Sequence, residues 1–226
     1  MADPALALSA VILSYLTGSL SFPWAIARLY GVDLQREGSR KLGGGNLIAT
    51  VGVVPGVIGG LLDAAKGLLA VVAARSLGLP VEVQLACGIA ANVGQMWPVF
   101  HRFDGGRANA TGWGFALAAD PIAAAIMGIP LLAALVGTSL ARPRPTRLFP
   151  LASLLSFLVF PAVIWEQEGV TPTVIGGALL AALILIRRVT AGVRLDLETG
   201  APVARVVVNR ALYDRSELQQ RGVVPI

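Results

Sequence analysis

The chain has 226 residues, of which 55% are hydrophobic and only 14% charged, and its formal net charge is +5. A soluble domain usually has about a quarter of its residues charged, so this composition and its long apolar runs favour an integral membrane protein. The positive charge indicates basic loops on one side of a bilayer. The sequence lacks the alternation of basic and aromatic residues that is typical of proteins that bind single-stranded nucleic acid.

The first apolar segment runs from Ala5 to Leu29 and is long enough to span a bilayer. The N-terminus lacks the basic region of a signal peptide, so we expect this segment to remain as a transmembrane helix. In its second half, Pro23 follows two serines and removes one helical hydrogen bond. The pattern predicts either a kinked helix or a functional break, with Arg28 at the membrane interface.

Residues 31–50 form the first substantial polar loop, in which three glycines lie close to Arg40 and Lys41. Glycine lets backbone amides approach a ligand closely because no Cβ is in the way. Consecutive amides of this kind can form a concavity that binds anions. The loop therefore suggests an anion site, although a flexible solvated loop has the same composition.

The second apolar segment runs from Val51 to Ala74 and contains Asp63 and Lys66, three residues apart on one face of a helix. Ionisable residues at membrane depth are costly and commonly mark function. The pair is therefore either part of a functional site or a structural ion pair that locks helix packing.

Five further apolar segments follow, and the basic stretch Arg142 to Arg147 separates two of them. We expect an all-α membrane domain of about seven transmembrane helices in residues 1–190, followed by a basic cytoplasmic tail in residues 191–226. Asp120 and Pro121 predict a tight break between two segments. The five segments are Val81 to Gly94, Thr111 to Ala119, Ile122 to Leu140, Leu148 to Trp165 and Pro172 to Ile186.

The distribution of charge over seven spans predicts the orientation. One side has nearly all the basic residues, including those of both glycine-rich loops and of the tail, whereas the other side has Arg75 alone among several acidic residues. Basic loops stay in the cytoplasm. We therefore expect the N-terminus outside, the tail inside, and both glycine-rich loops together on the cytoplasmic face.

The stretch from Gly94 to Thr111 lies between two apolar segments and combines the pair Gly105-Gly106 with Arg107. An arginine beside such a pair adds a fork of donors suited to phosphate. His101, the one histidine of the chain, has either a loop-surface role or a role in proton transfer. The sequence contains no P-loop, metal-ligand cluster or nucleophile elbow. We interpret the stretch as one wall of a phosphate-handling site.

Several motifs together resemble the bacterial membrane glycerol-3-phosphate acyltransferases that use acyl-phosphate as donor. Tyr15 to Leu20, with Arg28, looks like the first motif of that family, and Asp63-Ala64-Ala65-Lys66-Gly67 is similar to D-x-x-K-G. The family's G-S-G-N-x-G-A-T-N-V-x-R fits from Gly38 without gaps. Residues 94–111 resemble G-H-x-x-P-V-F followed by F-K-G-G-K-G-V-A-T.

The chain departs from these patterns at identifiable positions. Gln95 replaces the motif histidine and can donate and accept hydrogen bonds, but it cannot take up an additional proton at neutral pH. Asp104 and Arg107 stand where the family has lysines. Four further changes are Arg40-Lys41 for G-N, Gly44-Gly45 for A-T, Ala49 for the arginine and Ala108-Asn109 for G-V.

The resemblance implies a phosphate-rich site with no cofactor and no metal. Its substrates are acyl-phosphate and glycerol 3-phosphate, its location is the bacterial inner membrane, and the lipid tail enters between helices. We expect the substrate phosphate to accept the hydroxyl proton, so that Gln95→Ala weakens activity modestly whereas Arg107→Ala nearly abolishes it. The predicted catalytic residues are Ser19, Gln95, Arg107 and Asn109, the substrate-binding residues are Arg28, Ser39, Lys41, Gly43, Gly44, Gly45, Asn46, Gly105 and Gly106, and the scaffold residues are Asp63 and Lys66.

Three other functions stay open for the same residues. One is a non-catalytic paralogue that acts as a membrane scaffold or regulator, and the second is an acyltransferase for a different anionic acceptor. The third, a small transporter, is disfavoured because the two halves show no corresponding pair of broken helices. Acyl-chain preference and oligomeric state do not follow from the sequence.

Overall fold

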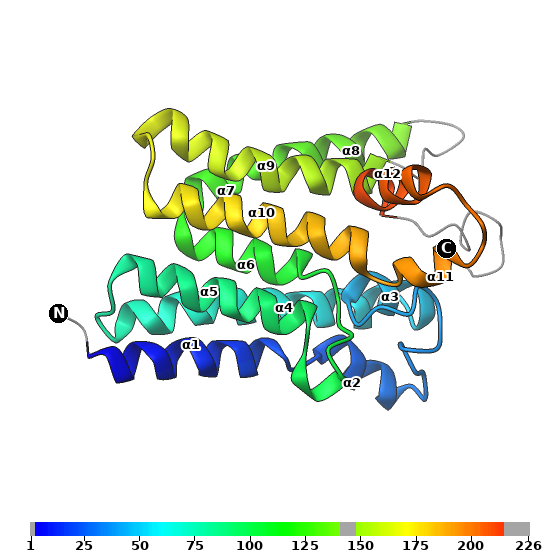
Figure 1. The fold of residues 1–226 in the computed structure, drawn as a ribbon, viewed down its shortest axis with the longest axis horizontal. Coiled ribbons are helices and arrows are strands. Elements are labelled where there is room, and N and C mark those ends of the chain that lie inside the picture. The colour runs from blue at the N-terminus through cyan, green and yellow to red at the C-terminus, as the bar shows by residue number, and fades with distance from the viewer. Residues whose placement is uncertain (1–2, 141–147, 215–226) are drawn as a thin grey trace. The chain divides into compact units, whose positions relative to one another are not determined.

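A computed structural model describes residues 3–140 and 148–214, and within these ranges the chain consists of helices and loops (Figure 1). The predicted basic loop at 142–147 lies outside the described residues. The elements in order are α1 (Pro4–Gly18), α2 (Phe22–Leu29), α3 (Gly44–Thr50), α4 (Val53–Ser76), α5 (Val81–Met96), the 3-10 helix η1 (Val99–His101), α6 (Asn109–Ala119), α7 (Pro121–Met127), α8 (Ile129–Leu140), α9 (Leu148–Glu168), α10 (Pro172–Thr190), α11 (Val193–Leu197) and α12 (Val203–Tyr213).

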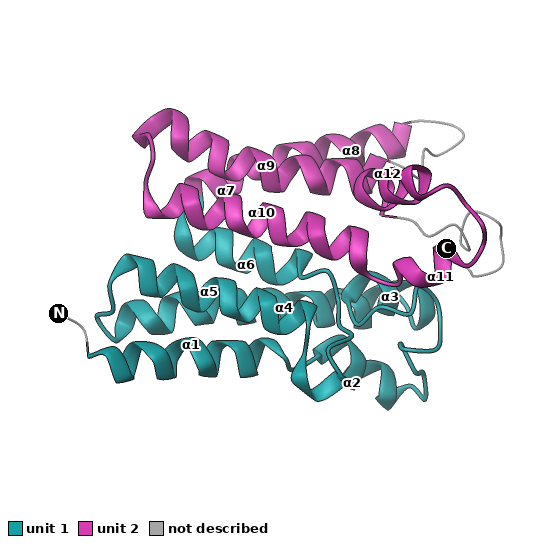
Figure 2. Cartoon of the chain, in the orientation of Figure 1, with its two compact units in different colours: residues 1–121 teal, residues 122–226 magenta. Residues whose placement is uncertain are grey.

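Helices α1 to α6 belong to one compact unit, residues 1–121, and α8 to α12 belong to a second, residues 122–226 (Figure 2). The division falls inside the predicted membrane domain. Within the second unit, α12 packs on α9 and α10, although its residues were assigned to the tail. The boundary at 190/191 stays a prediction.

Five stretches of the described chain are long and apolar enough to cross a membrane: Pro4–Leu29, Val53–Ser76, Pro121–Leu140, Leu148–Glu168 and Pro172–Thr190. They correspond to five of the seven predicted segments. The other two, α5 and α6, have 16 and 11 residues. At 1.5 Å per residue they reach about 24 and 16 Å, less than the roughly 30 Å hydrocarbon core. Five candidate spans are thus supported, and the count of seven and the orientation stay predictions.

The first predicted segment is a broken helix, not a continuous one. Helix α1 ends at Gly18, where the backbone N–H and hydroxyl of Ser19 both donate to Tyr15 O at 2.9 Å. Helix α2 restarts beyond Ser21, whose hydroxyl accepts from Trp24 N at 3.4 Å. Pro23 stands in the first turn of α2, where its missing N–H costs no helical bond. Ser19 therefore caps the end of α1, Ser21 caps the start of α2, and the proline lies in the first turn of the new helix.

Small residues bring the helices of the first unit into close contact. A side chain at Gly114 of α6 would collide with Ala64 O of α4, and one at Gly67 of α4 would collide with Thr111 O. Gly18 of α1 and Ala91 of α5 meet in the same way. Such contacts let backbones approach and replace the hydrophobic driving force that lipid removes. They place α4 against α6, and α1 against α5.

In the second unit, a buried ion pair holds the two C-terminal helices together. Arg210 Nε of α12 lies 2.6 Å from Asp196 Oδ2 of α11, and both side chains are almost fully buried. The Arg210 guanidinium also donates to the carbonyls of Ala191 and Gly192 at the end of α10. On α10, Arg188 Nη1 donates to Pro150 O of α9 at 2.9 Å. The Arg210 bonds satisfy carbonyls at the C-terminal end of α10, whereas the Arg188 bond ties α10 to the start of α9.

Two positions where the family motifs have glycine keep a left-handed backbone in this chain. Arg40 has φ 56° and Ala108 has φ 53°. A left-handed conformation costs a residue with a Cβ about 1–2 kcal/mol, whereas glycine adopts it readily. The loops thus keep the backbone that the glycines would favour although the side chains have changed.

Ala108→Gly is therefore expected to stabilise the protein. The relief of strain exceeds the added entropy of an unfolded glycine by about 0.5–1 kcal/mol. For a chain of this size we expect a rise of about 2 °C in the melting temperature, measured by intrinsic fluorescence in detergent. Ala110→Gly, inside the first turn of α6, is the control and should lower it. A fall with Ala108→Gly would show that the methyl group's packing outweighs the strain.

Candidate functional site

The break between α1 and α2 receives the side chain of Lys66. Its ammonium donates to Gly18 O at 3.1 Å and to Leu20 O at 2.6 Å. It also pairs with Asp63 Oδ1 at 2.9 Å, one turn earlier on α4. Carbonyls at a helix C-terminus carry partial negative charge, so they suit a cation. The ion pair is almost fully buried and locks α4 onto the end of α1.

Gln95, at the position of the motif histidine, connects this ion pair to the loops. Its Nε2 donates to Asp63 Oδ2 at 3.0 Å and to Leu42 O at 3.1 Å, and its Oε1 accepts from Lys66. Only 4% of the residue is exposed. One amide thus serves two acceptors and one donor at once. A neutral imidazole has one donor and one acceptor, so glutamine makes one more bond than the histidine it replaces.

The two glycine-rich loops meet at Leu42 and Gly106. Gly106 N donates to Gln95 O at 3.0 Å, and a Cβ on Gly106 would lie 2.6 Å from Leu42 O. A side chain at Gly105 would collide with Gln95 O. Gly106 is therefore required for the close approach of the two loops, and Gly105 for packing of its loop against the end of α5. Tyr15 adds a further link, because its hydroxyl donates to Trp97 O at 2.8 Å.

Asn46 organises the first loop from inside. Its Nδ2 lies within hydrogen-bond distance of three carbonyls, those of Leu34, Glu37 and Lys41, at 3.1–3.2 Å. Its Oδ1 accepts from Ser39 N at 2.8 Å. The side chain is 5% exposed. The amide therefore shapes the loop, and its contact with substrate stays a prediction.

The glycines of this loop differ in their surroundings. A Cβ at Gly44 would lie 2.9 Å from Gly56 O, so this glycine packs α3 against α4. Gly43 and Gly45 have open space where a side chain would stand. The polar loop thus ends in a short helix, α3, that the sequence did not predict. Beside Gly43 and Gly45, at the start of this helix, the space that a side chain would take is free.

The other predicted residues lie at different depths. Ser19 is buried at the helix break and uses its hydroxyl on Tyr15 O. Arg28 is exposed, lies 5.3 Å from the centre of the Trp24 ring and approaches Asp33 to 3.7 Å. Arg107 is half-buried between Gly106 and Ala108. Asn109 begins α6, and its buried Oδ1 makes no hydrogen bond with the described residues.

His101 packs on α2. Its ring makes an edge contact with Trp24, with 4.9 Å between ring centres and 63° between planes. Burial, together with the nearby Lys66 ammonium, lowers the pKa of His101 below its usual value of 6.5. The ring is therefore neutral at pH 7. The packing fits a loop-surface role, and both that role and proton transfer stay predictions.

Sequence reasoning missed groups that act through the backbone. The carbonyls of Gly18, Leu20 and Leu42 hold Lys66 and Gln95, but a carbonyl has no signature in a sequence. Thr111 is the last residue of the third motif, and the sequence gives its hydroxyl no role. In the structure this hydroxyl is fully buried and makes no hydrogen bond with the described residues. The signals that the sequence offers for these backbone contacts are glycines of the third motif, such as Gly94, Gly105 and Gly106, where backbones approach closely.

Gln95→Ala should cost stability in the first place. Three buried partners lose their hydrogen bond, at about 1–3 kcal/mol for each group left unsatisfied. Asp63 and Lys66 still pair with each other after the change, so we expect a total loss of only about 2–4 kcal/mol, seen as a lower melting temperature, and a modest loss of activity as the loops separate. Gln84→Ala, in the first turn of α5 and partly exposed, is the control. A large loss of activity at unchanged stability would instead place Gln95 on the substrate.

Comparison with known proteins supports one assignment. The family model for glycerol-3-phosphate acyltransferase matches residues 8–195. A glycerol-3-phosphate acyltransferase of Rubrobacter xylanophilus is 37% identical over 171 residues, covering 74% of this chain and 82% of that protein. One of Neisseria meningitidis serogroup C is 38% identical over 188 residues, covering 80% and 88%.

Two solved structures are similar over nearly the whole fold. Both are crystal structures of PlsY (YgiH), an integral membrane glycerol 3-phosphate acyltransferase. The glycerol 3-phosphate form has a TM-score of 0.73 and 29% sequence identity, covering 89% of this chain and 98% of that one. The lysophosphatidic acid form has a TM-score of 0.71 and 28% identity, covering 90% and 99%.

Proposed function

The chain belongs to the glycerol-3-phosphate acyltransferase family, and on this premise we propose that it acylates glycerol 3-phosphate to give lysophosphatidic acid. It is an all-helical, multi-pass membrane protein, and we place it in the bacterial inner membrane. The acyl donor is acyl-phosphate. The observation that carries the proposal is the junction of two glycine-rich loops on a buried ion pair through Gln95.

The junction supports the reaction by presenting fixed backbone and cationic groups to two phosphates. The open faces of Gly43 and Gly45 leave room for the donor phosphate beside Ser39. Arg107, Lys41 and Arg28 supply positive charge for the acceptor phosphate and for charge that develops in the transition state. Asn46, Gly105 and Gly106 contribute by fixing the loops.

Acyl-phosphate is an activated mixed anhydride, so the transfer requires no covalent acyl-enzyme. A free hydroxyl oxygen of glycerol 3-phosphate attacks the acyl carbonyl carbon. The new ester C–O bond forms, and the bond from that carbon to the phosphate oxygen breaks. The products are lysophosphatidic acid and inorganic phosphate. The protein lowers the barrier by holding both anions in position and excluding water.

We assign the hydroxyl proton to the phosphate itself. Gln95 cannot accept a proton at neutral pH, and its amide already makes hydrogen bonds with Asp63, Lys66 and Leu42. The leaving phosphate gains negative charge as the hydroxyl loses its proton, so it is a suitable acceptor. The loss of the motif histidine is then compatible with turnover.

A competition among acceptors tests the proposed substrate. Purified protein in lipid is supplied with palmitoyl phosphate and labelled glycerol 3-phosphate, labelled glycerol, or other labelled phosphorylated alcohols. We expect that, of these acceptors, glycerol 3-phosphate alone is acylated, and that labelled lysophosphatidic acid and released phosphate form in equal amounts. Stronger acylation of a different anion would reassign the acceptor. Binding without any product, by a folded protein, would indicate a non-catalytic paralogue.

A further inference from the structure

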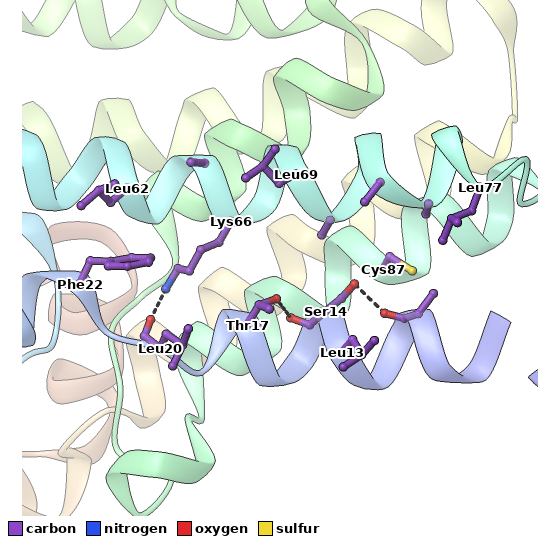
Figure 3. A pocket seen from close by; sticks show the side chains of 15 residues that line it. Leu13, Ser14, Thr17, Leu20, Phe22, Leu62, Lys66, Leu69, Leu77 and Cys87 are labelled. Atoms are coloured by element: carbon purple, nitrogen blue, oxygen red, sulfur yellow. Dashed lines mark hydrogen bonds between the residues drawn. The ribbon is translucent and has the colours of Figure 1, made fainter. Parts of the chain in front are cut away.

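An apolar groove lies between α1 and α4. Both helices pack on α5, but alanines on α4 leave a cavity of about 470 Å³ between α4 and α1. Ala70, Ala74 and Cys87 are buried at its base. Figure 3 shows α4 along one side of this groove, α1 along the other and Cys87 of α5 at its base.

The groove begins at the site described above. Lys66 lines one end, beside Leu20 and Phe22, and donates to Leu20 O (Figure 3). From there the lining continues along α4 to Leu77, eleven residues further and about 16 Å at 1.5 Å per residue. Through Lys66 and Gln95 this end connects directly to Leu42. The end of the groove thus lies two hydrogen bonds away from the loop at which the head of a donor would bind.

The chemistry of the lining favours a hydrocarbon. Eleven of the fifteen lining side chains are aliphatic or aromatic, and the others are Ser14, Thr17, Lys66 and Cys87. The two hydroxyls are already used within α1, because Ser14 donates to Ala10 O at 2.8 Å and Thr17 donates to Ser14 O at 3.0 Å. A polar occupant would therefore gain few hydrogen bonds along the length of the groove, whereas each buried methylene gains free energy.

With the proposed function, the acyl chain of the donor lies in this groove, and we propose that Ala73 of α4 determines how long a chain the groove accepts. The inference rests on the proposed function, which supplies the acyl donor. Ala73 lies seven residues beyond Lys66, about 10 Å along the helix, and lines the groove from its exposed side. Its small side chain leaves the far half of the groove open. A large side chain there excludes the distal methylenes of a long chain and leaves a short chain untouched.

The test compares two donors on one variant. With Ala73→Phe, we expect kcat/KM for palmitoyl phosphate to fall about tenfold, the effect of about two methylenes losing apolar contact. The value for octanoyl phosphate should stay within about twofold of wild type. Val72→Phe is the matched control, because Val72 is exposed on the same turn but does not line the groove, and it should change neither donor.

The outcomes separate this inference from the proposed function. Product formed by the wild type with either donor supports the reaction. An equal fall for both donors, or an unchanged preference, with Ala73→Phe would overturn the role of the groove, leaving it to a membrane lipid. A palmitoyl phosphonate with a photoreactive terminal methyl group tests the groove even without turnover. It should label α1 or α4 near Leu77, and labelling confined to other helices would overturn the inference.

Discussion

Changing Lys66 to methionine is expected to destabilise the protein by about 3–5 kcal/mol, the usual cost of breaking a buried ion pair by removing one partner. Methionine keeps the apolar stem but removes the ammonium. Asp63, which is 2% exposed, is left as a buried charge without its cation. The carbonyls of Gly18 and Leu20 lose their donor at the same time. We expect a low yield of folded protein, a large fall in melting temperature in detergent and no detectable activity.

A second variant separates charge from geometry. In the double variant Asp63→Asn with Lys66→Met, no uncompensated charge remains, so part of the lost stability should return. Lys41→Met, on a half-buried loop lysine, is the control for a methionine change elsewhere and should leave the melting temperature nearly unchanged. If Lys66→Met were as stable as wild type, the ion pair would not hold α4 to the helix break, and the assigned scaffold role would be wrong.

Changing Arg107 to alanine is expected to lower kcat/KM for glycerol 3-phosphate by about a hundredfold to a thousandfold, the range for removing one donor that stabilises transition-state charge. The residue lies between two buried positions at the junction of the loops, and we propose that its guanidinium holds the acceptor phosphate. Arg107→Lys introduces the residue that the family motif has at this position. It keeps the positive charge but lacks the bidentate fork of arginine, so it should retain more activity than Arg107→Ala and less than wild type.

Stability must be measured in parallel for Arg107→Ala. We expect its melting temperature to stay within about 2 °C of wild type, because the side chain is half-buried and the loop is held by Gln95 and Gly106. Arg102→Ala is the control, since Arg102 is an exposed arginine in the same stretch. An equal loss of activity in both variants would show that general positive charge, not Arg107, serves the reaction.

The fold was predictable where long apolar runs decide it. The helices α4, α9 and α10 were located from hydrophobicity alone, and the break at Asp120 and Pro121 falls between α6 and α7 as predicted. The short helix α3 was missed because three successive glycines and asparagine disfavour a helix. Packing of Gly44 against Gly56 and Gly60 stabilises it instead, and such a contact over a distance in sequence has no local signal.

The site was predictable as a meeting of two loops, but not as a network. Asp63 and Lys66 at i and i+3 predicted their ion pair, which the structure contains. Gln95 could be read only as a lost histidine, since its value depends on the carbonyl of Leu42 and on an ion pair from another helix. Left-handed φ at Arg40 and Ala108 was likewise invisible in the sequence, because the residues that favour it are absent.

The most direct test of the account is one assay on three purified proteins: wild type, Arg107→Ala and Arg102→Ala, each given acyl-phosphate and labelled glycerol 3-phosphate in lipid. The account predicts labelled lysophosphatidic acid from wild type and from Arg102→Ala, and almost none from Arg107→Ala. That result would establish acyl transfer without the motif histidine. A folded wild type that forms no product, or an Arg107→Ala variant as active as wild type, would contradict it.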